Sequence, residues 1–394
     1  MTEAANARRN ILLLAVAQAL YSCCVITVFA TAGLVGLTLA PTPGLATAPI
    51  TTFVLGSMFA TIPASLLMQK IGRPPVFMFG AAMAVLGACL AVWSIFNANF
   101  VAFCFATAIY GVFQATSGFY RFAAAESSDA DTKSIAISWV LTGGVVAAVA
   151  GTVIASRTSD YFPQYVFAGS YAATAFLALA NIAVIAMLHL PKQSVSAVSG
   201  PARPWSELLQ QPRLIVAMAS AMISYALMNL MMTAAPVAMI GCGYTKDDAS
   251  WVIQWHVLAM FVPSFFTGQL IRKFGVEKIV ALGMLLLMTA AGAGLLGITF
   301  GHFAVALMLL GLGWNFGFIG GTAMLTDCYR DTERGKVQAA NDFGISLLMA
   351  IASLSSGILL ADFGWASVPL AIFPPAAIAL AMLAWLVVQQ PRAA

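Results

Sequence analysis

Long apolar stretches alternate with short polar turns along almost the entire chain. A stretch of about 20 apolar residues is long enough to cross the ~30 Å hydrocarbon core of a bilayer as a helix. The pattern predicts twelve such helices, at residues 10–37, 48–69, 74–95, 98–122, 132–156, 164–189, 212–240, 247–271, 276–298, 302–326, 335–360 and 365–388. We therefore expect an all-α, multi-pass membrane protein.

Composition supports this expectation and narrows the function classes. Hydrophobic residues make up 61% of the chain and charged residues only 8%, whereas about a quarter of the residues in an ordinary soluble domain are charged. The polar residues form no evident nucleophile–base pair and no open metal site. We expect no enzymatic activity and no resident cofactor.

The distribution of basic residues predicts the orientation in the membrane. With the N-terminus in the cytoplasm, all but two of the 18 Lys and Arg residues fall on the cytoplasmic side, the exceptions being Arg157 and Lys246. This bias follows the positive-inside rule and predicts that both termini are cytoplasmic. The net charge of +4 thus reflects membrane topology, and we expect the lipid bilayer, not nucleic acid, as the surrounding partner.

The predicted helices divide into two similar halves. A polar connection at residues 191–211 separates a six-helix bundle at 1–190 from another at 212–394. The turn that ends in Gly72 after the second helix recurs as the turn that ends in Gly275 after the eighth. A Tyr-Arg pair likewise ends both the fourth and the tenth helix. The halves are predicted to be repeats.

Six plus six helices, a central cytoplasmic connection and G-x-L-x-x-[RK]-x-G turns resemble the Major Facilitator Superfamily. The resemblance implies two pseudo-symmetric bundles and secondary transport by alternating access. Both turns depart from the family pattern, because Gln69 and Arg272 stand where an Asp is usual. The fifth helix also lacks the Gly-Pro signature of drug–proton antiporters, which argues against drug efflux.

Two i, i+4 pairs carry the candidate chemistry. Met228 and Met232 lie in the seventh helix, and His256 and Met260 lie in the eighth. Each pair shares one helix face, and thioether and imidazole groups together form a soft ligand set suited to Cu(I). Both pairs are expected at similar depths, ~14–20 Å from the outer membrane edge. An ionisable side chain within the membrane commonly marks a transport path.

These helices resemble those of the CcoA-like copper importers, a branch marked by M-x-x-x-M and H-x-x-x-M. The resemblance implies import of copper across a bacterial inner membrane. It also implies a carrier or chelator that delivers copper, and a chaperone that passes it on for heme–copper oxidase assembly. Cys242, at the outer end of the seventh helix, is a candidate first acceptor for the ion.

Three alternatives remain open. The chain has 19 Met residues, and M-x-x-x-M recurs at Met218 and Met284, so the pairs also fit flexible core packing. In addition, related importers carry organic solutes such as riboflavin. An aromatic solute needs stacking surfaces and amide partners, for which the candidates are Gln18, Tyr21, Trp314 and Asn315. A non-transporting membrane receptor or copper-delivery scaffold is a third class.

Overall fold

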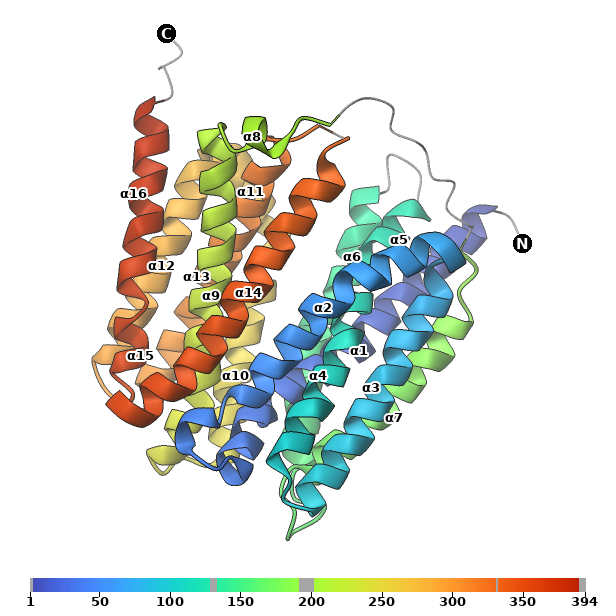
Figure 1. Ribbon diagram of the computed structural model, residues 1–394, viewed down its shortest axis with the longest axis vertical. Helices are drawn as coiled ribbons and strands as arrows, with labels where there is room; N and C mark the ends of the chain where they lie inside the picture. The colour runs from blue at the N-terminus through green and yellow to red at the C-terminus, as the bar shows by residue number, and fades with distance from the viewer. Residues whose placement is uncertain (1–2, 128–132, 191–201, 331, 390–394) are drawn as a thin grey trace. The chain divides into compact units, whose positions relative to one another are not determined.

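Helices dominate the part of the chain that the computed structural model describes, namely residues 3–127, 133–190, 202–330 and 332–389, where every regular element is helical. The chain divides into two compact units, Met1–Val195 and Ser196–Ala394. In each unit the long helices lie side by side as a bundle (Figure 1).

The first unit contains the predicted spans one to six. Its elements are α1 (Glu3–Leu39), the 3-10 helix η1 (Pro43–Leu45), α2 (Ala48–Ile71), α3 (Arg73–Phe96), α4 (Phe100–Ser117), α5 (Tyr120–Glu126), α6 (Lys133–Thr158) and α7 (Ala168–Ala186). The fourth predicted span is thus two helices, because the chain leaves α-helical geometry briefly between α4 and α5.

The second unit contains spans seven to twelve and the short helix α8 (Trp205–Leu208) in the connection. Its long elements are α9 (Pro212–Gly241), α10 (Lys246–Phe261), α11 (Ser264–Phe274), α12 (Val276–Leu295), α13 (Phe300–Thr326), α14 (Arg334–Phe363), α15 (Ser367–Leu370) and α16 (Phe373–Gln389). The eighth predicted span is broken, because α10 and α11 meet at an angle of 43°.

Helix pairing repeats from one unit to the other. In the first unit α1 packs on α6, α4 packs on both α2 and α3, and α3 packs on α7. The equivalent helices of the second unit make the same pairs: α9 with α14, α13 with α10 and α12, and α12 with α16. This agreement supports the internal repeat that the two glycine turns predict.

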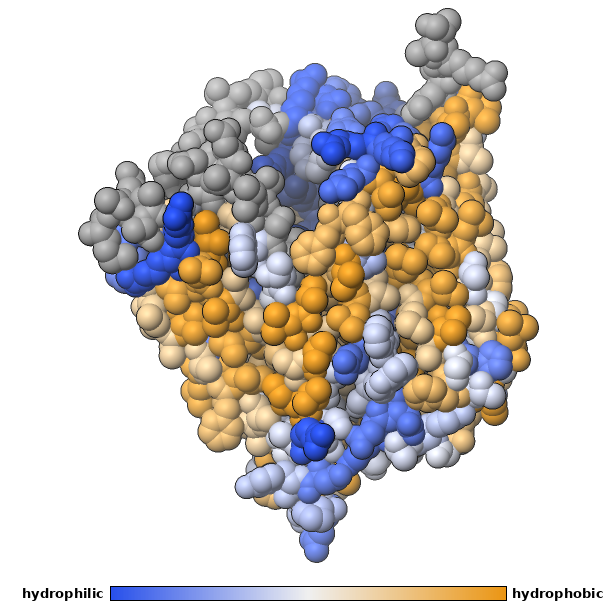
Figure 2. Space-filling view, turned by 180° about the vertical axis from the view of Figure 1, so that it is seen from behind, coloured by the Kyte–Doolittle hydropathy of each residue, from blue (hydrophilic) through white to orange (hydrophobic). Residues whose placement is uncertain are grey.

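The lateral surfaces of the helices are apolar. Among the described residues, ten helical segments are long and apolar enough to span a membrane, and the bent pair α10–α11 makes an eleventh. The 26-residue helix α6 covers the predicted fifth span. Hydrophobic residues cover the flanks of the helices and hydrophilic residues gather toward their ends (Figure 2). Side chains such as Phe176, 72% exposed, are therefore stable in contact with lipid.

The two repeated turns depend on glycine. Gly72 ends α2 with φ 89° and ψ 168°, and Gly275 ends α11 with φ 90° and ψ 147°. Each backbone N–H closes the preceding helix, Gly72 on the Met68 carbonyl and Gly275 on the Ile271 carbonyl. This region of backbone conformation is essentially restricted to glycine. The glycine turns are thus a structural element that both repeats share.

The polar connection is attached to the second unit by a charged cluster. The Arg203 guanidinium donates Nε to Glu333 Oε1 and Nη2 to Oε2, both at 2.7 Å. The backbone N–H groups of Arg203 and Arg330 donate to the same carboxylate at 3.0 Å. Lys336 adds a bond from Nζ to the Arg203 carbonyl at 2.9 Å. The Glu333 side chain is fully buried among these donors.

These donors shift the ionisation of the cluster. The hydrogen bonds from Arg203, together with the backbone N–H groups, hold the pKa of the Glu333 carboxyl well below its usual range. The carboxylate in turn raises the pKa of Arg203. A depressed folded-state pKa means that the pair stabilises the folded state above the unfolded pKa of roughly 4.3. That contribution is lost only as the pH falls through the lower folded-state value.

We predict that Gly72→Ala destabilises the protein by about 1–3 kcal/mol, because alanine must adopt the strained positive φ. No neighbouring atom lies within 4 Å of an added Cβ, so strain alone is tested. The measurement is thermal unfolding in a fixed detergent. Gly268→Ala, in helix α11 and equally unobstructed, is the control and should leave stability unchanged or slightly raised. Equal effects of both variants would contradict the prediction.

We predict that the connection stays attached between pH ~7 and ~4.5, because Glu333 remains ionised there. The protection of residues 202–211 against hydrogen exchange, taken relative to the intrinsic exchange rate at each pH, should be high and nearly constant over this range. Glu333→Gln removes the ion pair and should accelerate exchange at every pH tested. Glu207→Gln, in α8 of the same segment, is the matched control and should exchange like the wild type. Wild-type exchange that rises sharply near pH 5 would refute this assignment.

Candidate functional site

His256, the centre of the predicted metal site, packs against α13. Its side chain is fully buried, and Nδ1 lies 2.7 Å from the Leu307 carbonyl oxygen. A carbonyl only accepts hydrogen bonds, so Nδ1 carries the proton. Among the described residues, buried Nε2 has no hydrogen-bond partner. Nδ1 thus links α10 to α13 by a hydrogen bond, and Nε2 remains an unpaired acceptor among the described residues.

Met260 lies on the same α10 stripe as His256 and faces the same helix. Its backbone carbonyl accepts a hydrogen bond from Asn315 Nδ2 at 2.6 Å. Between these two contacts, α13 carries Gly311. A Cβ built there would lie 2.5 Å from the His256 carbonyl oxygen and 3.1 Å from the Met260 amide nitrogen. Glycine thus allows the backbones of α10 and α13 to approach closely.

The methionine pair on α9 is also buried. Met228 is 2% exposed and Met232 6%. Their neighbours bond to α14, since Asn229 Nδ2 donates to the Met349 carbonyl at 3.0 Å and Thr233 Oγ1 lies 2.8 Å from Ser356 Oγ. Cys242 lies exposed at the C-terminal end of α9. A metal-ligand role for these residues stays a prediction.

An aromatic cluster adjoins the predicted metal site, since Phe261 directly follows Met260 and Tyr225 lies three residues before Met228. It consists of Tyr225 on α9, Phe261 on α10, and Trp314 and Phe318 on α13. The rings of Trp314 and Phe318 stack with centroids 5.1 Å apart and planes 14° apart. Tyr225 contacts both edge-on, at 5.3 and 5.1 Å, and Phe261 lies 6.2 Å from Trp314. Three different helices thus contribute to one aromatic surface.

The cluster is partly open and contains an unpaired donor. Tyr225, Phe261 and Phe318 are half-buried, so parts of their rings are free of protein packing. Trp314 is 5% exposed. Its indole Nε1 is a buried donor without a partner among the described residues. A planar apolar ring system with acceptor atoms at its edge fits these properties. Of these four residues, only Trp314 is among the candidates predicted from the sequence. Phe318 follows it at i+4 and therefore shares its helix face, which also marks Phe318 as a candidate.

Asn315 belongs to a different surface from its neighbour Trp314. It is fully buried and donates from Nδ2 to the Met260 carbonyl and to Ser264 Oγ, at 2.6 and 2.7 Å. Consecutive residues of a helix project in directions about 100° apart. The expectation that both residues line one solute-binding surface is therefore not met.

Tyr21 and Gln18 lie in the first unit, on α1. The Tyr21 hydroxyl donates to Gln114 Oε1 on α4, and its ring packs edge-on against Phe113 at 5.2 Å. Gln18 Nε2 donates to Ser22 Oγ at 3.1 Å. Because Gln18 and Gln114 are half-buried, their amides form a polar group that could exchange partners with a solute.

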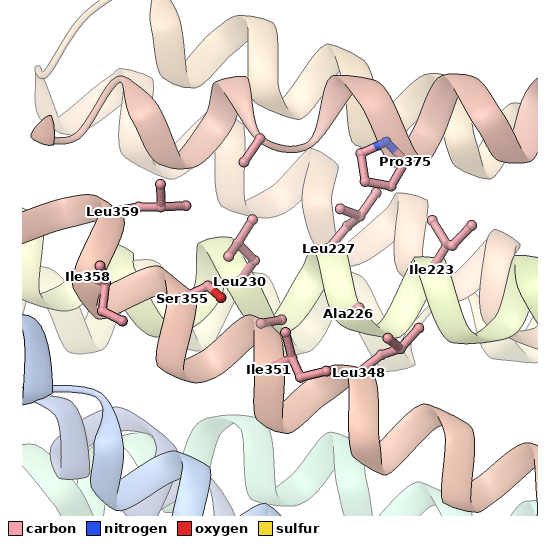
Figure 3. A pocket seen from close by; sticks show the side chains of 12 residues that line it. Ile223, Ala226, Leu227, Leu230, Leu348, Ile351, Ser355, Ile358, Leu359 and Pro375 are labelled. Atoms are coloured by element: carbon pink, nitrogen blue, oxygen red, sulfur yellow. The ribbon is translucent and has the colours of Figure 1, made fainter.

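The pocket between α9, α14 and α16 does not have the chemistry of a flavin or copper site. It has a volume of about 510 Å³, and its walls are aliphatic side chains such as Leu227, Leu348 and Ile351 (Figure 3). Ser355 supplies the one side-chain hydroxyl of its lining. A solute with polar edges would leave its hydrogen-bonding groups unpaired there.

Comparison with known proteins assigns the family. The model of the Major Facilitator Superfamily matches residues 14–245 and 217–394. The chain belongs to this superfamily. It is therefore a transporter and not an enzyme, and the predicted all-α, multi-span major facilitator fold is confirmed.

Solved structures of this superfamily share the fold. A mutant of the nucleoside transporter NupG matches with a TM-score of 0.70 and 14% identity, over 97% of this chain and 100% of the other. An auto-inhibited POT family peptide transporter matches with a TM-score of 0.71 and 12% identity, over 98% of both chains. Identities this low concern the fold alone.

Sequence relatives bear on the substrate. The riboflavin transporter RfnT of Brucella anthropi is 45% identical over 385 residues, 97% of either chain. The uncharacterised MFS-type transporter YdeG of Bacillus subtilis is 27% identical over 347 residues, 84% of this chain and 80% of its own.

The similarity to RfnT contradicts copper as the substrate, and with it the CcoA-like branch, the copper ion as partner, its carrier and its chaperone. The physical reason for the error is visible in α10. His256 and the Met260 backbone contact α13, so their i, i+4 spacing is explained by helix packing.

We predict that Gly311→Ala destabilises this major facilitator protein by about 1–3 kcal/mol, because the new Cβ forces α10 and α13 apart. Thermal unfolding in detergent measures the effect. Gly292→Ala on α12, where an added Cβ meets nothing within 4 Å, is the matched control. A melting temperature for Gly311→Ala that equals or exceeds that of the control would show that the close approach is dispensable.

Proposed function

We propose that this protein is a secondary transporter of riboflavin. The observation that carries the proposal is the 45% identity to the riboflavin transporter RfnT over 97% of the chain. Identity at that level over nearly the full length supports a shared substrate class. Copper chemistry is not needed to account for any contact described above.

The aromatic cluster supports a flavin substrate on chemical grounds. Riboflavin carries a flat, three-ring isoalloxazine with an apolar edge, a pyrimidine-like edge with carbonyl and nitrogen acceptors, and a polyhydroxylated side chain. The half-buried rings of Tyr225, Phe261 and Phe318 offer stacking surfaces, which favour aromatic ligands through offset and edge-on contacts. The Trp314 indole N–H is a donor in the same cluster.

We further infer that the protein lies in a bacterial inner membrane with both termini in the cytoplasm and moves its substrate inward. The orientation rests on the positive-inside bias, with all but two of the 18 basic residues on one side. The inward direction rests on the resemblance to importers of organic solutes such as riboflavin.

The proposal predicts uptake of radiolabelled riboflavin by cells that express this chain and lack their own riboflavin synthesis and uptake. Phe318→Leu should raise KM roughly fivefold, because loss of one aromatic contact costs about 1 kcal/mol. Phe105→Leu makes the same change on α4 at a side chain 65% exposed and should leave KM unchanged.

Uptake must be normalised to the amount of protein in the membrane. A wild-type chain that moves no riboflavin would overturn the proposed function. Wild-type uptake combined with equal KM values for the two variants would remove the aromatic cluster from the binding site.

A further inference from the structure

The bend between α10 and α11 creates a local problem of hydrogen bonding. Pro263 lies at the break and has no N–H to donate to a carbonyl one turn earlier. Backbone carbonyls left without donors within a membrane cost several kcal/mol each, since no water replaces the lost bond. A bent span therefore requires donors from elsewhere in the protein.

Asn315 of α13 contacts both sides of this break. Before the break, its Nδ2 donates to the Met260 carbonyl at 2.6 Å. After the break, Nδ2 donates to Ser264 Oγ at 2.7 Å, and Oδ1 lies 2.6 Å from Thr267 Oγ1. The fully buried amide thus uses both N–H groups and its carbonyl on one bent segment.

The same residues adjoin the aromatic cluster. Phe261 is the last residue of α10, directly after Met260, and Trp314 directly precedes Asn315. The two rings lie 6.2 Å apart. The hydrogen bond between Asn315 and Met260 therefore joins the backbones that carry these rings.

We propose that Asn315 is a positioning residue for substrate binding, because it fixes the α10–α11 bend and thereby holds Phe261 against Trp314. This inference rests on the proposed function, since it concerns affinity for a flavin. Asn315 itself does not contact the substrate. Its amide sets the geometry of the aromatic surface on which the isoalloxazine stacks.

The first test measures riboflavin binding to purified protein by quenching of flavin fluorescence. Asn315→Leu removes all three contacts and should raise Kd roughly tenfold. Thr267→Val removes the Thr267 contacts with Asn315 Oδ1 and with the Pro263 carbonyl, with almost no change of shape, and should raise Kd by a smaller factor. Thr267→Ser keeps the hydroxyl and should bind like the wild type.

Asn181→Leu is the matched control. Asn181 is also a fully buried amide; it donates from Nδ2 to the Ala17 carbonyl at 2.7 Å and accepts from the Tyr120 hydroxyl at 3.1 Å. It lies in the first unit, whereas every ring of the aromatic cluster belongs to the second. The control should lower thermal stability, as Asn315→Leu does, but change Kd less than twofold. Equal Kd values for Asn315→Leu and Asn181→Leu would overturn the proposal.

A second measurement separates failure of this proposal from failure of the proposed function. Spin labels at Trp251→Cys and Gln269→Cys, on exposed positions of α10 and α11, report the bend without any ligand. The proposal expects a broader distance distribution in Asn315→Leu than in the wild type. An unchanged distribution in Asn315→Leu would refute the positioning role of Asn315, whereas broadening in Asn315→Leu together with a wild type that binds no riboflavin would refute only the substrate.

Discussion

The structure depends on one constraint, the absence of water inside a bilayer. Every backbone polar group within a span has to find its partner in the protein. Straight helices such as α12 and α13 meet this demand internally. At the break between α10 and α11, the Met260 carbonyl accepts a hydrogen bond from the Asn315 side chain of α13. Asn315, through its bonds to Met260 and Ser264, therefore connects the bent span to the helix that carries Trp314 of the candidate site.

Close helix approach is the second organising feature, and it follows from glycine. Gly311 brings α13 against the α10 backbone, and Gly283 brings α12 against α13, where an added Cβ would lie 2.5 Å from the Gly317 amide nitrogen. In the first unit, Gly56 and Gly111 play the same part between α2 and α4. Small residues at helix contacts are how membrane helices gain van der Waals packing, because burial from lipid adds little. In the second unit, Gly311 brings together α10 and α13, and both of these helices contribute rings to the aromatic cluster.

The wrong assignment of copper as substrate has an instructive cause. A Met or His at i and i+4 shares one helix face whether that face binds a metal or packs on another helix. His256 donates Nδ1–H to the Leu307 carbonyl, and the Met260 backbone carbonyl accepts from Asn315; both contacts place this face of α10 against α13. The spacing was a correct observation of a shared face, but it did not identify the occupant of that face.

The sequence by itself determined the fold class, the two-fold repeat and the glycine turns, because these depend on local chemistry. Apolar length decides which segments can span a bilayer, and the positive φ of Gly72 and Gly275 needs no distant partner. Only the tertiary structure decided that Trp314 and Asn315, adjacent in sequence, serve different surfaces, and that Tyr225, Phe261 and Phe318 gather around one of them. Those contacts join three helices, and their rotation about their axes is set by packing between side chains far apart in the chain.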